Sequence, residues 1–128
     1  YSGMPFLVAY SGSKAALAIM TKNIANSLAG HQIRVNALNI GWTDTPAEHD
    51  IQKRVHTKGD DWLEKEESKV PFKRLIKTID VAKGLAFMCS DESGLMTGSV
   101  IDFDQTVNGW HSYSAYDTNI LDDSLLGE

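Results

Sequence analysis

The chain has 128 residues, 42% of them hydrophobic, with ten glycines and three prolines, which fits one ordinary globular domain. Acidic side chains outnumber basic ones by 17 to 12, and no run of Lys or Arg forms the basic stripe that nucleic acid requires. No apolar stretch approaches the roughly 20 residues of a bilayer-spanning helix, and the first residues do not show the basic segment followed by an apolar one that is typical of a signal peptide, so we expect a soluble cytoplasmic protein without nucleic-acid or membrane partners.

The first predicted element is a long helix over residues 10–29. The chain opens Tyr1-Ser2-Gly3 with no initiator Met and reaches this helix almost at once, so we expect it to be part of a longer protein. Apolar residues then recur at helical spacing, at Leu17, Met20, Ile24 and Leu28. Gly30 is predicted to end the helix in a left-handed conformation.

Residues 33–40 predict a buried parallel strand, because the segment is short, contains β-branched residues and is apolar on both faces toward its end. A helix that runs into such a strand through a short loop is half of a βαβ unit. This order favours an α/β fold with a parallel sheet.

The next helix start is marked by Thr45 as N-cap, Pro46 at the first helical position and Glu48 at the third. Charges alternate in sign through the following segment, Trp62 and Leu63 are its main large apolar residues, and Gly59 interrupts it. We predict two short helices that form a solvated flap, residues 46–70.

A third helix is predicted after Thr78, with one apolar face made by Val81, Ala82, Leu85, Ala86 and Cys89. Cys89 is the only cysteine, which excludes an intrachain disulfide, and we expect it to be a buried structural thiol. Residues 99–103 alternate and predict a second strand. Residues 110–128 form a polar tail.

Tyr10 and Lys14 are four residues apart, so a helix places the phenol and the ammonium on one face, one turn apart. A neighbouring positive charge favours the phenolate, which allows the tyrosine to exchange protons with a substrate hydroxyl. Tyr10 is therefore a candidate general acid or base. Spacing alone is a weak signal, because such pairs occur by chance on many helices.

The surrounding residues make the signal more specific. The segment Tyr10-Ser11-Gly12-Ser13-Lys14-Ala15-Ala16 resembles the active-site helix of the short-chain dehydrogenase/reductase family. Further segments match the family in order: residues 33–37, residues 40–46, residues 71–75, Asp80-Val81-Ala82 and residues 97–101. Several spaced motifs agree over residues 3–109, which makes accidental similarity improbable.

The resemblance implies that residues 1–109 are the C-terminal half of a Rossmann-type doubly wound parallel sheet that binds NAD or NADP. It makes Tyr10 the proton donor or acceptor, and Lys14 the residue that tunes Tyr10 and bonds the nicotinamide ribose. Gly41, Thr43 and Thr45 match the loop that holds the nicotinamide. The family's catalytic serine and glycine-rich loop are expected outside this chain.

Other residues near this loop have two interpretations. Thr45 either caps its helix or contacts the nicotinamide, and the Pro46 and Glu48 pattern favours capping. Trp42 and His49 are substrate-pocket candidates, and the flap is either a solvated helical pair or a lid that excludes water. The four histidines lack metal-ligand spacing, so no metal site is predicted.

Two segments depart from the family pattern. Ile40 stands where a proline commonly precedes Gly41. The last strand reads Asp102-Phe103-Asp104-Gln105-Thr106 where the family often has Asp-Gly-Gly, so contacts with the cofactor or another subunit are in question there. Asp102 and Asp104 lie on one face of the strand, where solvation or contact with another subunit is expected.

The predicted function is reversible hydride transfer between a secondary alcohol and the nicotinamide, which interconverts the alcohol and a ketone; a sugar or polyol is a candidate substrate. A homodimer or homotetramer is expected. One alternative is a catalytically idle family member that acts as an oligomerisation or regulatory partner. Another is an independent α/β interaction module, in which Tyr10 and Lys14 are only surface neighbours.

Overall fold

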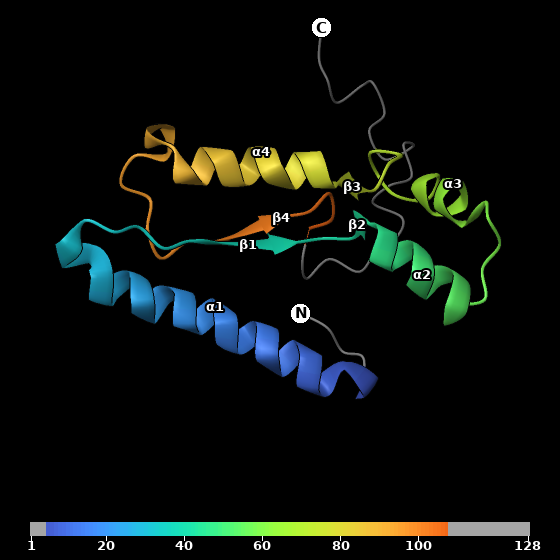
Figure 1. Cartoon of the computed structure of the whole chain (residues 1–128), viewed down its shortest axis with the longest axis horizontal. Helices are drawn as coiled ribbons and strands as arrows, with labels where there is room; N and C mark the ends of the chain where they lie inside the picture. The colour runs from blue at the N-terminus through green and yellow to red at the C-terminus, as the bar shows by residue number, and fades with distance from the viewer. Residues whose placement is uncertain (1–4, 108–128) are drawn as a thin grey trace, which may run out of the picture.

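Helices and short parallel strands alternate through residues 5–107, which are the residues that the computed structural model describes (Figure 1). The predicted polar tail, residues 110–128, lies outside this range. The elements in chain order are the 3-10 turn Pro5–Leu7, helix α1 Val8–Leu28, the 3-10 turn Ala29–His31, strands β1 Ala37–Ile40 and β2 Thr43–Asp44, helices α2 Pro46–Arg54 and α3 Trp62–Glu67, strand β3 Ile76–Lys77, helix α4 Thr78–Cys89, the 3-10 turn Asp91–Ser93, and strand β4 Val100–Phe103. None of the helices in residues 5–107 has the length and apolar character needed to cross a membrane.

The strands form two parallel pairs. β1 pairs with β4, with Ala37 opposite Val100 and Ile40 opposite Phe103. β2 pairs with β3 over two residues, with Thr43 opposite Ile76. Parallel neighbours far apart in sequence require crossover connections, and helices supply them here. The predicted α/β class with a parallel sheet is confirmed.

The predicted strand over residues 33–40 is shorter in the structure and begins at Ala37. The preceding residues bond to a loop instead of a strand. Val35 N donates to the Thr97 hydroxyl at 3.1 Å, and Val35 O accepts from Gly98 N at 2.8 Å. The loop before β4 therefore takes the hydrogen bonds that a longer ladder would have used.

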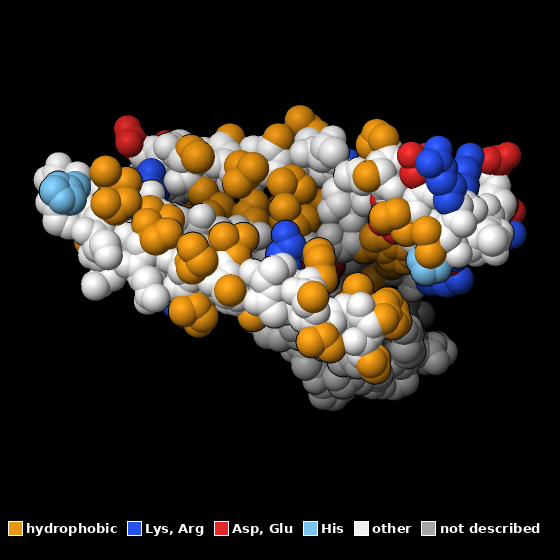
Figure 2. All heavy atoms as spheres, turned by 60° about the horizontal axis from the view of Figure 1, so that its bottom comes forward, with side chains coloured by type: hydrophobic (Ala, Val, Ile, Leu, Met, Phe, Trp, Pro, Cys, Tyr) orange, Lys and Arg blue, Asp and Glu red, His pale blue; other side chains and the backbone are white. Residues whose placement is uncertain are grey.

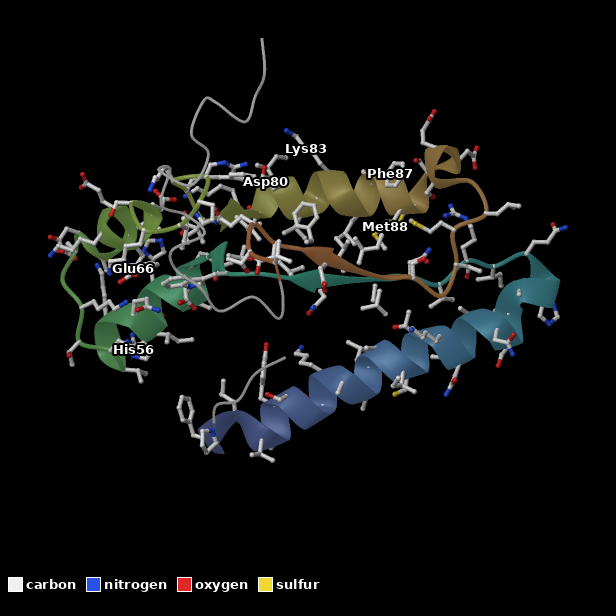
Figure 3. All side chains as sticks on the ribbon, turned by 180° about the vertical axis from the view of Figure 1, so that it is seen from behind. His56, Glu66, Asp80, Lys83, Phe87 and Met88 are labelled. Atoms are coloured by element: carbon white, nitrogen blue, oxygen red, sulfur yellow. The ribbon has the colours of Figure 1, made fainter. Side chains whose placement is uncertain are left out.

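The β1–β4 pair lies between two helices, α4 on one side and α1 on the other (Figure 1). A Cβ at Gly84 of α4 would meet the Phe103 ring at 3.2 Å and Leu38 at 3.3 Å, so α4 packs tightly on the strands. Met88 of α4 points toward the strands and Lys83 points away (Figure 3). The third helix is confirmed, with Met88 as its buried apolar residue.

The large side chains that are fully buried among the described residues lie within the flap or close to its end and not under α1. Trp62 is 1% exposed and Leu75 is 0% exposed. Along α1, in contrast, the apolar residues Leu17, Met20 and Ile24 remain partly or largely exposed, and orange side chains follow this helix in Figure 2. The apolar periodicity that predicted the helix therefore marks a face that other described residues do not cover.

Two local predictions are wrong. Gly30 lies inside a 3-10 turn, and the left-handed residue is Gln32, with φ of 60°, whose N–H bonds Ala29 O at 2.9 Å. The helix ends by tightening through one more turn before the chain reverses. Cys89 is exposed, because it is the last residue of α4 and Met88 takes the buried position beside it.

Candidate active site

Tyr10 and Lys14 lie one turn apart near the start of α1, as the spacing predicts. The Lys14 Nζ atom lies 5.4 Å from the centroid of the Tyr10 ring, close enough for a cation–π contact. Tyr10 is 59% exposed, and the Ser13 hydroxyl donates to the Tyr10 carbonyl at 2.7 Å. The helix thus presents a phenol and an ammonium together on an accessible surface.

Gly41 follows β1 directly and continues its pairing, because Gly41 N donates to Phe103 O at 3.0 Å. A Cβ at this position would overlap the carboxylate of Asp104. The requirement for glycine is therefore already set by a neighbouring side chain within the protein. We expected Gly41 to allow close approach of a cofactor, and the structure shows Asp104 as its close neighbour.

The two threonines of the loop 41–45 have hydrogen bonds of their own. The Thr43 hydroxyl donates to Gly41 O at 2.9 Å, which closes the loop on itself. The Thr45 hydroxyl accepts from Glu48 N at 3.2 Å, so Thr45 caps α2 as predicted. Each hydroxyl therefore already has one hydrogen-bond partner within the protein.

Trp42 and His49 both contact Trp62, the buried residue that begins α3. The Trp42 and Trp62 rings are stacked with centroids 6.3 Å apart, and His49 meets Trp62 edge-on at 4.9 Å. Trp62 Nε1 donates to His49 Nδ1 at 3.2 Å, and His49 Nε2 lies 2.7 Å from Asp44 Oδ1. His49 Nδ1 is the acceptor in this arrangement, so the ring proton is on Nε2 and is donated to Asp44.

The buried cluster around Trp62 anchors the flap. The flap does contain two short helices, as predicted, but it is anchored by the buried Trp62 and by the buried Gln52 as well as by surface contacts. Trp42 and His49 are only partly exposed, because each gives one side to Trp62. They line the flap interface, and any contact with a substrate must use their remaining surface.

Lys77 links the flap to β2. Its ammonium lies 2.9 Å from Asp44 Oδ2 and 2.7 Å from Glu67 Oε1. The Lys77 hydrogen bond lowers the pKa of Asp44 and also that of Glu67, which further accepts from Leu75 N. Burial opposes the charged form of Lys77, but the two carboxylates outweigh it and raise the pKa of Lys77.

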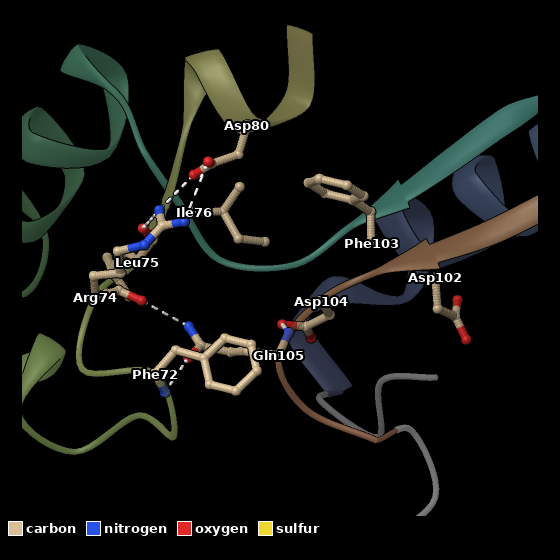
Figure 4. A pocket seen from close by; sticks show the side chains of 9 residues that line it. All are labelled: Phe72, Arg74, Leu75, Ile76, Asp80, Asp102, Phe103, Asp104 and Gln105. Atoms are coloured by element: carbon tan, nitrogen blue, oxygen red, sulfur yellow. Dashed lines mark hydrogen bonds and ion pairs between the residues drawn. The ribbon is translucent and has the colours of Figure 1, made fainter. Parts of the chain in front are cut away.

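A pocket of about 290 Å³ opens at the carboxyl end of β4 (Figure 4). Parallel sheets commonly bind ligands at this end. The Arg74 guanidinium pairs with Asp80, and this contact together with a bond from Lys77 N lowers the pKa of Asp80 to about 2. The pocket is lined by Phe72, Arg74, Leu75, Ile76, Asp80, Asp102, Phe103, Asp104 and Gln105.

None of the site residues predicted from the sequence lines this pocket. Its lining includes Asp104 and Gln105, which belong to the segment that departs from the family pattern. Asp104 lies against Gly41, and Gln105 bonds the backbone of residues 72 and 74. Within residues 5–107, no group of three or more His, Cys, Asp or Glu side chains is arranged to hold a metal ion.

Sequence comparison agrees with the motifs. The family model described as enoyl-(acyl carrier protein) reductase matches residues 1–108. The chain is 37% identical over 102 residues to the 3-oxoacyl-(acyl-carrier-protein) reductase FabG of Thermotoga maritima, covering 80% of this chain and 39% of that protein. It is 36% identical over 100 residues to 4-formylbenzenesulfonate dehydrogenase of Comamonas testosteroni, covering 78% and 39%. It thus spans about two fifths of the length of these relatives.

Solved structures give the same result. A short chain dehydrogenase family protein from Francisella tularensis superposes with a TM-score of 0.70 at 36% identity, over 82% of this chain and 45% of that one. The L-sorbose reductase of Gluconobacter frateurii, solved with NADPH and L-sorbose, gives 0.69 at 28% identity, over 80% and 41%. The chain belongs to the short-chain dehydrogenase/reductase family.

Proposed function

We propose that the protein to which this chain belongs is an NAD(P)-dependent oxidoreductase that interconverts a secondary alcohol and a ketone. The observation that carries the proposal is the Tyr10 and Lys14 pair, with the Lys14 Nζ atom 5.4 Å from the Tyr10 ring centroid on an accessible helix face. When bound, the nicotinamide supplies the hydride acceptor or donor. The relatives named as reductases and dehydrogenases support this class of reaction.

Tyr10 moves the proton. In the oxidation direction the phenolate accepts the proton of the substrate hydroxyl as the carbinol hydrogen leaves as hydride, and in reduction the phenol returns that proton to the carbonyl oxygen. Lys14 keeps a positive charge beside the phenolate, and its three N–H donors suit the hydroxyls of a ribose. The pair therefore fits a nicotinamide coenzyme chemically.

The loop 41–45 holds the nicotinamide through main-chain groups of Gly41, Thr43 and Thr45. The hydroxyls of both threonines already have partners in the protein, which supports main-chain contacts in this role. Trp42 and His49 contact substrate with the surface that Trp62 leaves open, and the flap closes over it. The related L-sorbose reductase structure contains NADPH and L-sorbose, which supports NADP as the coenzyme and a sugar or polyol as the substrate.

We further propose that residues 1–109 form one half of a nucleotide-binding catalytic domain. The protein is located in the cytoplasm and assembles as a homodimer or homotetramer. The chain matches only 39% of the Thermotoga relative, and the apolar residues of α1 are not covered by other described residues. Both observations support association of this chain with further polypeptide.

The test uses the protein expressed from its complete coding sequence. Coenzyme binding is followed by tryptophan fluorescence, and turnover is measured with a panel of sugar alcohols and ketoses. Tyr10→Phe and Lys14→Met are expected to lower kcat/KM by roughly 100-fold or more. Lys22→Met, which makes the same change two turns further along α1, is the matched control and should retain activity.

A wild-type protein that binds coenzyme but turns over no alcohol or ketone would favour the idle family member as a regulatory or oligomerisation partner. A protein that binds neither NAD nor NADP would support the independent interaction module and refute the enzyme.

A further inference from the structure

The side-chain amide of Gln105, just after β4, bonds the main chain of a distant segment at both of its ends. Gln105 Oε1 accepts from Phe72 N at 2.9 Å, and Gln105 Nε2 donates to Arg74 O at 2.9 Å (Figure 4). An amide offers a donor and an acceptor, and here one of each is used on the same turn. The turn, residues 72–74, connects the end of the flap to β3.

The residue between the two contacts is in an unusual conformation. Lys73 has φ of 54°, in the left-handed region that residues with a Cβ populate sparsely. Within the turn, Lys73 N bonds Val70 O at 3.1 Å. A turn that contains such a residue persists only where surrounding contacts hold it, and the Gln105 amide supplies two of them.

The turn determines the path of the chain into β3. Arg74 pairs with Asp80 in the first turn of α4, with Nη2 3.2 Å from Oδ1, and Leu75 N bonds Glu67 Oε1 at 2.9 Å. Ile76 N of β3 then donates to Trp42 O at 3.2 Å, which joins the strand that follows the turn to the loop 41–45. Residues 43 and 44 pair with residues 76 and 77 in register.

The geometry points to Gln105 as a positioning residue: its amide holds the turn 72–74, and through β3 this turn sets the position of the loop 41–45 and of the flap. The catalytic consequence rests on the proposed function, in which the loop holds the nicotinamide. The family often has glycine in this part of the last strand, and a glycine has no side chain to make either bond. The two hydrogen bonds to the turn therefore explain why a glutamine at position 105, where the family often has glycine, has a structural role in this chain.

The experiment compares three variants of the complete protein. Gln105→Met keeps the length of the side chain and removes both hydrogen bonds. Gln105→Glu keeps the acceptor for Phe72 N and loses the donor to Arg74 O. Thr106→Val is the matched control, because the Thr106 hydroxyl bonds only Asp104 Oδ2, at 2.6 Å, among the contacts that the structure describes, and does not touch the turn.

The first measurement is hydrogen exchange in peptides that cover residues 70–77, which does not depend on any activity. Gln105→Met is expected to increase exchange there roughly tenfold, the effect of losing one to two hydrogen bonds, and Gln105→Glu should also increase it, because a carboxylate oxygen cannot donate to Arg74 O and repels it. Thr106→Val should leave it unchanged. Unchanged exchange in Gln105→Met would overturn the inference.

The second measurement is steady-state kinetics. Gln105→Met is expected to raise the KM for coenzyme by roughly tenfold with kcat at saturation nearly unchanged, because the loop is displaced while Tyr10 and Lys14 are intact. Faster exchange with an unchanged KM, in a protein that Tyr10→Phe inactivates, would overturn the positioning role and leave the proposed function standing. Absence of wild-type turnover would overturn the proposed function and the catalytic role together, and exchange would still decide whether Gln105 holds the turn.

Discussion

Replacing Trp62 by alanine tests whether the flap is held by one buried side chain. Trp62 is 1% exposed and contacts both Trp42 and His49. An aromatic side chain buries about 150–250 Å², which at roughly 25 cal/mol/Å² corresponds to about 4–6 kcal/mol. Trp→Ala changes in protein cores cost about 3–5 kcal/mol. We therefore expect Trp62→Ala to lower the free energy of opening the flap by about 4 kcal/mol.

Two further variants separate the contributions to this value. Trp62→Phe keeps an aromatic ring in place and removes the N–H that His49 Nδ1 accepts, so it should cost about 1–2 kcal/mol. Trp42→Phe is the matched control for a tryptophan substitution. Trp42 is 37% exposed, and its loss of ring area and of the bond to Glu48 should cost less than Trp62→Ala.

The assay is hydrogen exchange over α2 and α3 in the complete protein, with urea unfolding followed by far-UV circular dichroism, since tryptophan fluorescence changes with the variants themselves. Faster exchange should be concentrated in α2 and α3 and be weak in α4. If Trp62→Ala exchanges at the wild-type rate in both flap helices, or costs no more than Trp42→Phe, the anchoring role of Trp62 is refuted.

Three other results are expected. Gly41→Ala should destabilise the protein, because the new Cβ overlaps the Asp104 carboxylate, and adding Asp104→Ala should restore stability. Thermal unfolding of the single and double variants measures this recovery, and a double variant no more stable than Gly41→Ala would contradict the overlap. The pKa of Asp80 is lowered to about 2 by Arg74, so its contribution to stability is complete above about pH 4 and is lost as the pH falls toward 2; urea midpoints should decline over this range, and an equal decline in Arg74→Met would contradict the pairing. Cys89 is exposed, so a thiol reagent should modify it in the native protein as fast as in urea, and slow native modification would contradict its placement.

Much of the local structure could be predicted because it depends on neighbours in the chain. The Thr45, Pro46 and Glu48 pattern predicted the start of α2, and the structure has the Thr45 cap bond to Glu48 N. The spacing of Tyr10 and Lys14 predicted their contact, because any regular helix brings residues four apart together. Family membership followed from several such short motifs in the right order.

Predictions that depended on burial were less successful. Cys89 was expected to be buried because it continues an apolar helical pattern, yet Met88 takes the buried position. Periodicity identifies the apolar side of a helix but not which of its residues another element covers. The exposed Leu17 and Met20 on α1 illustrate the same distinction.

The sequence by itself determined the helices, the two strands β1 and β4, the family and the Tyr10 and Lys14 pair, because each is encoded in residues close together in the chain; the short β2–β3 pair was not predicted. Only the tertiary structure decided that Trp62 lies between Trp42 and His49, that Asp104 fills the space beside Gly41, and that Gln105 bridges the turn 72–74. These contacts join residues that are 13 to 63 positions apart, and no rule of sequence spacing links residues so far apart; only the packing of the elements brings them together.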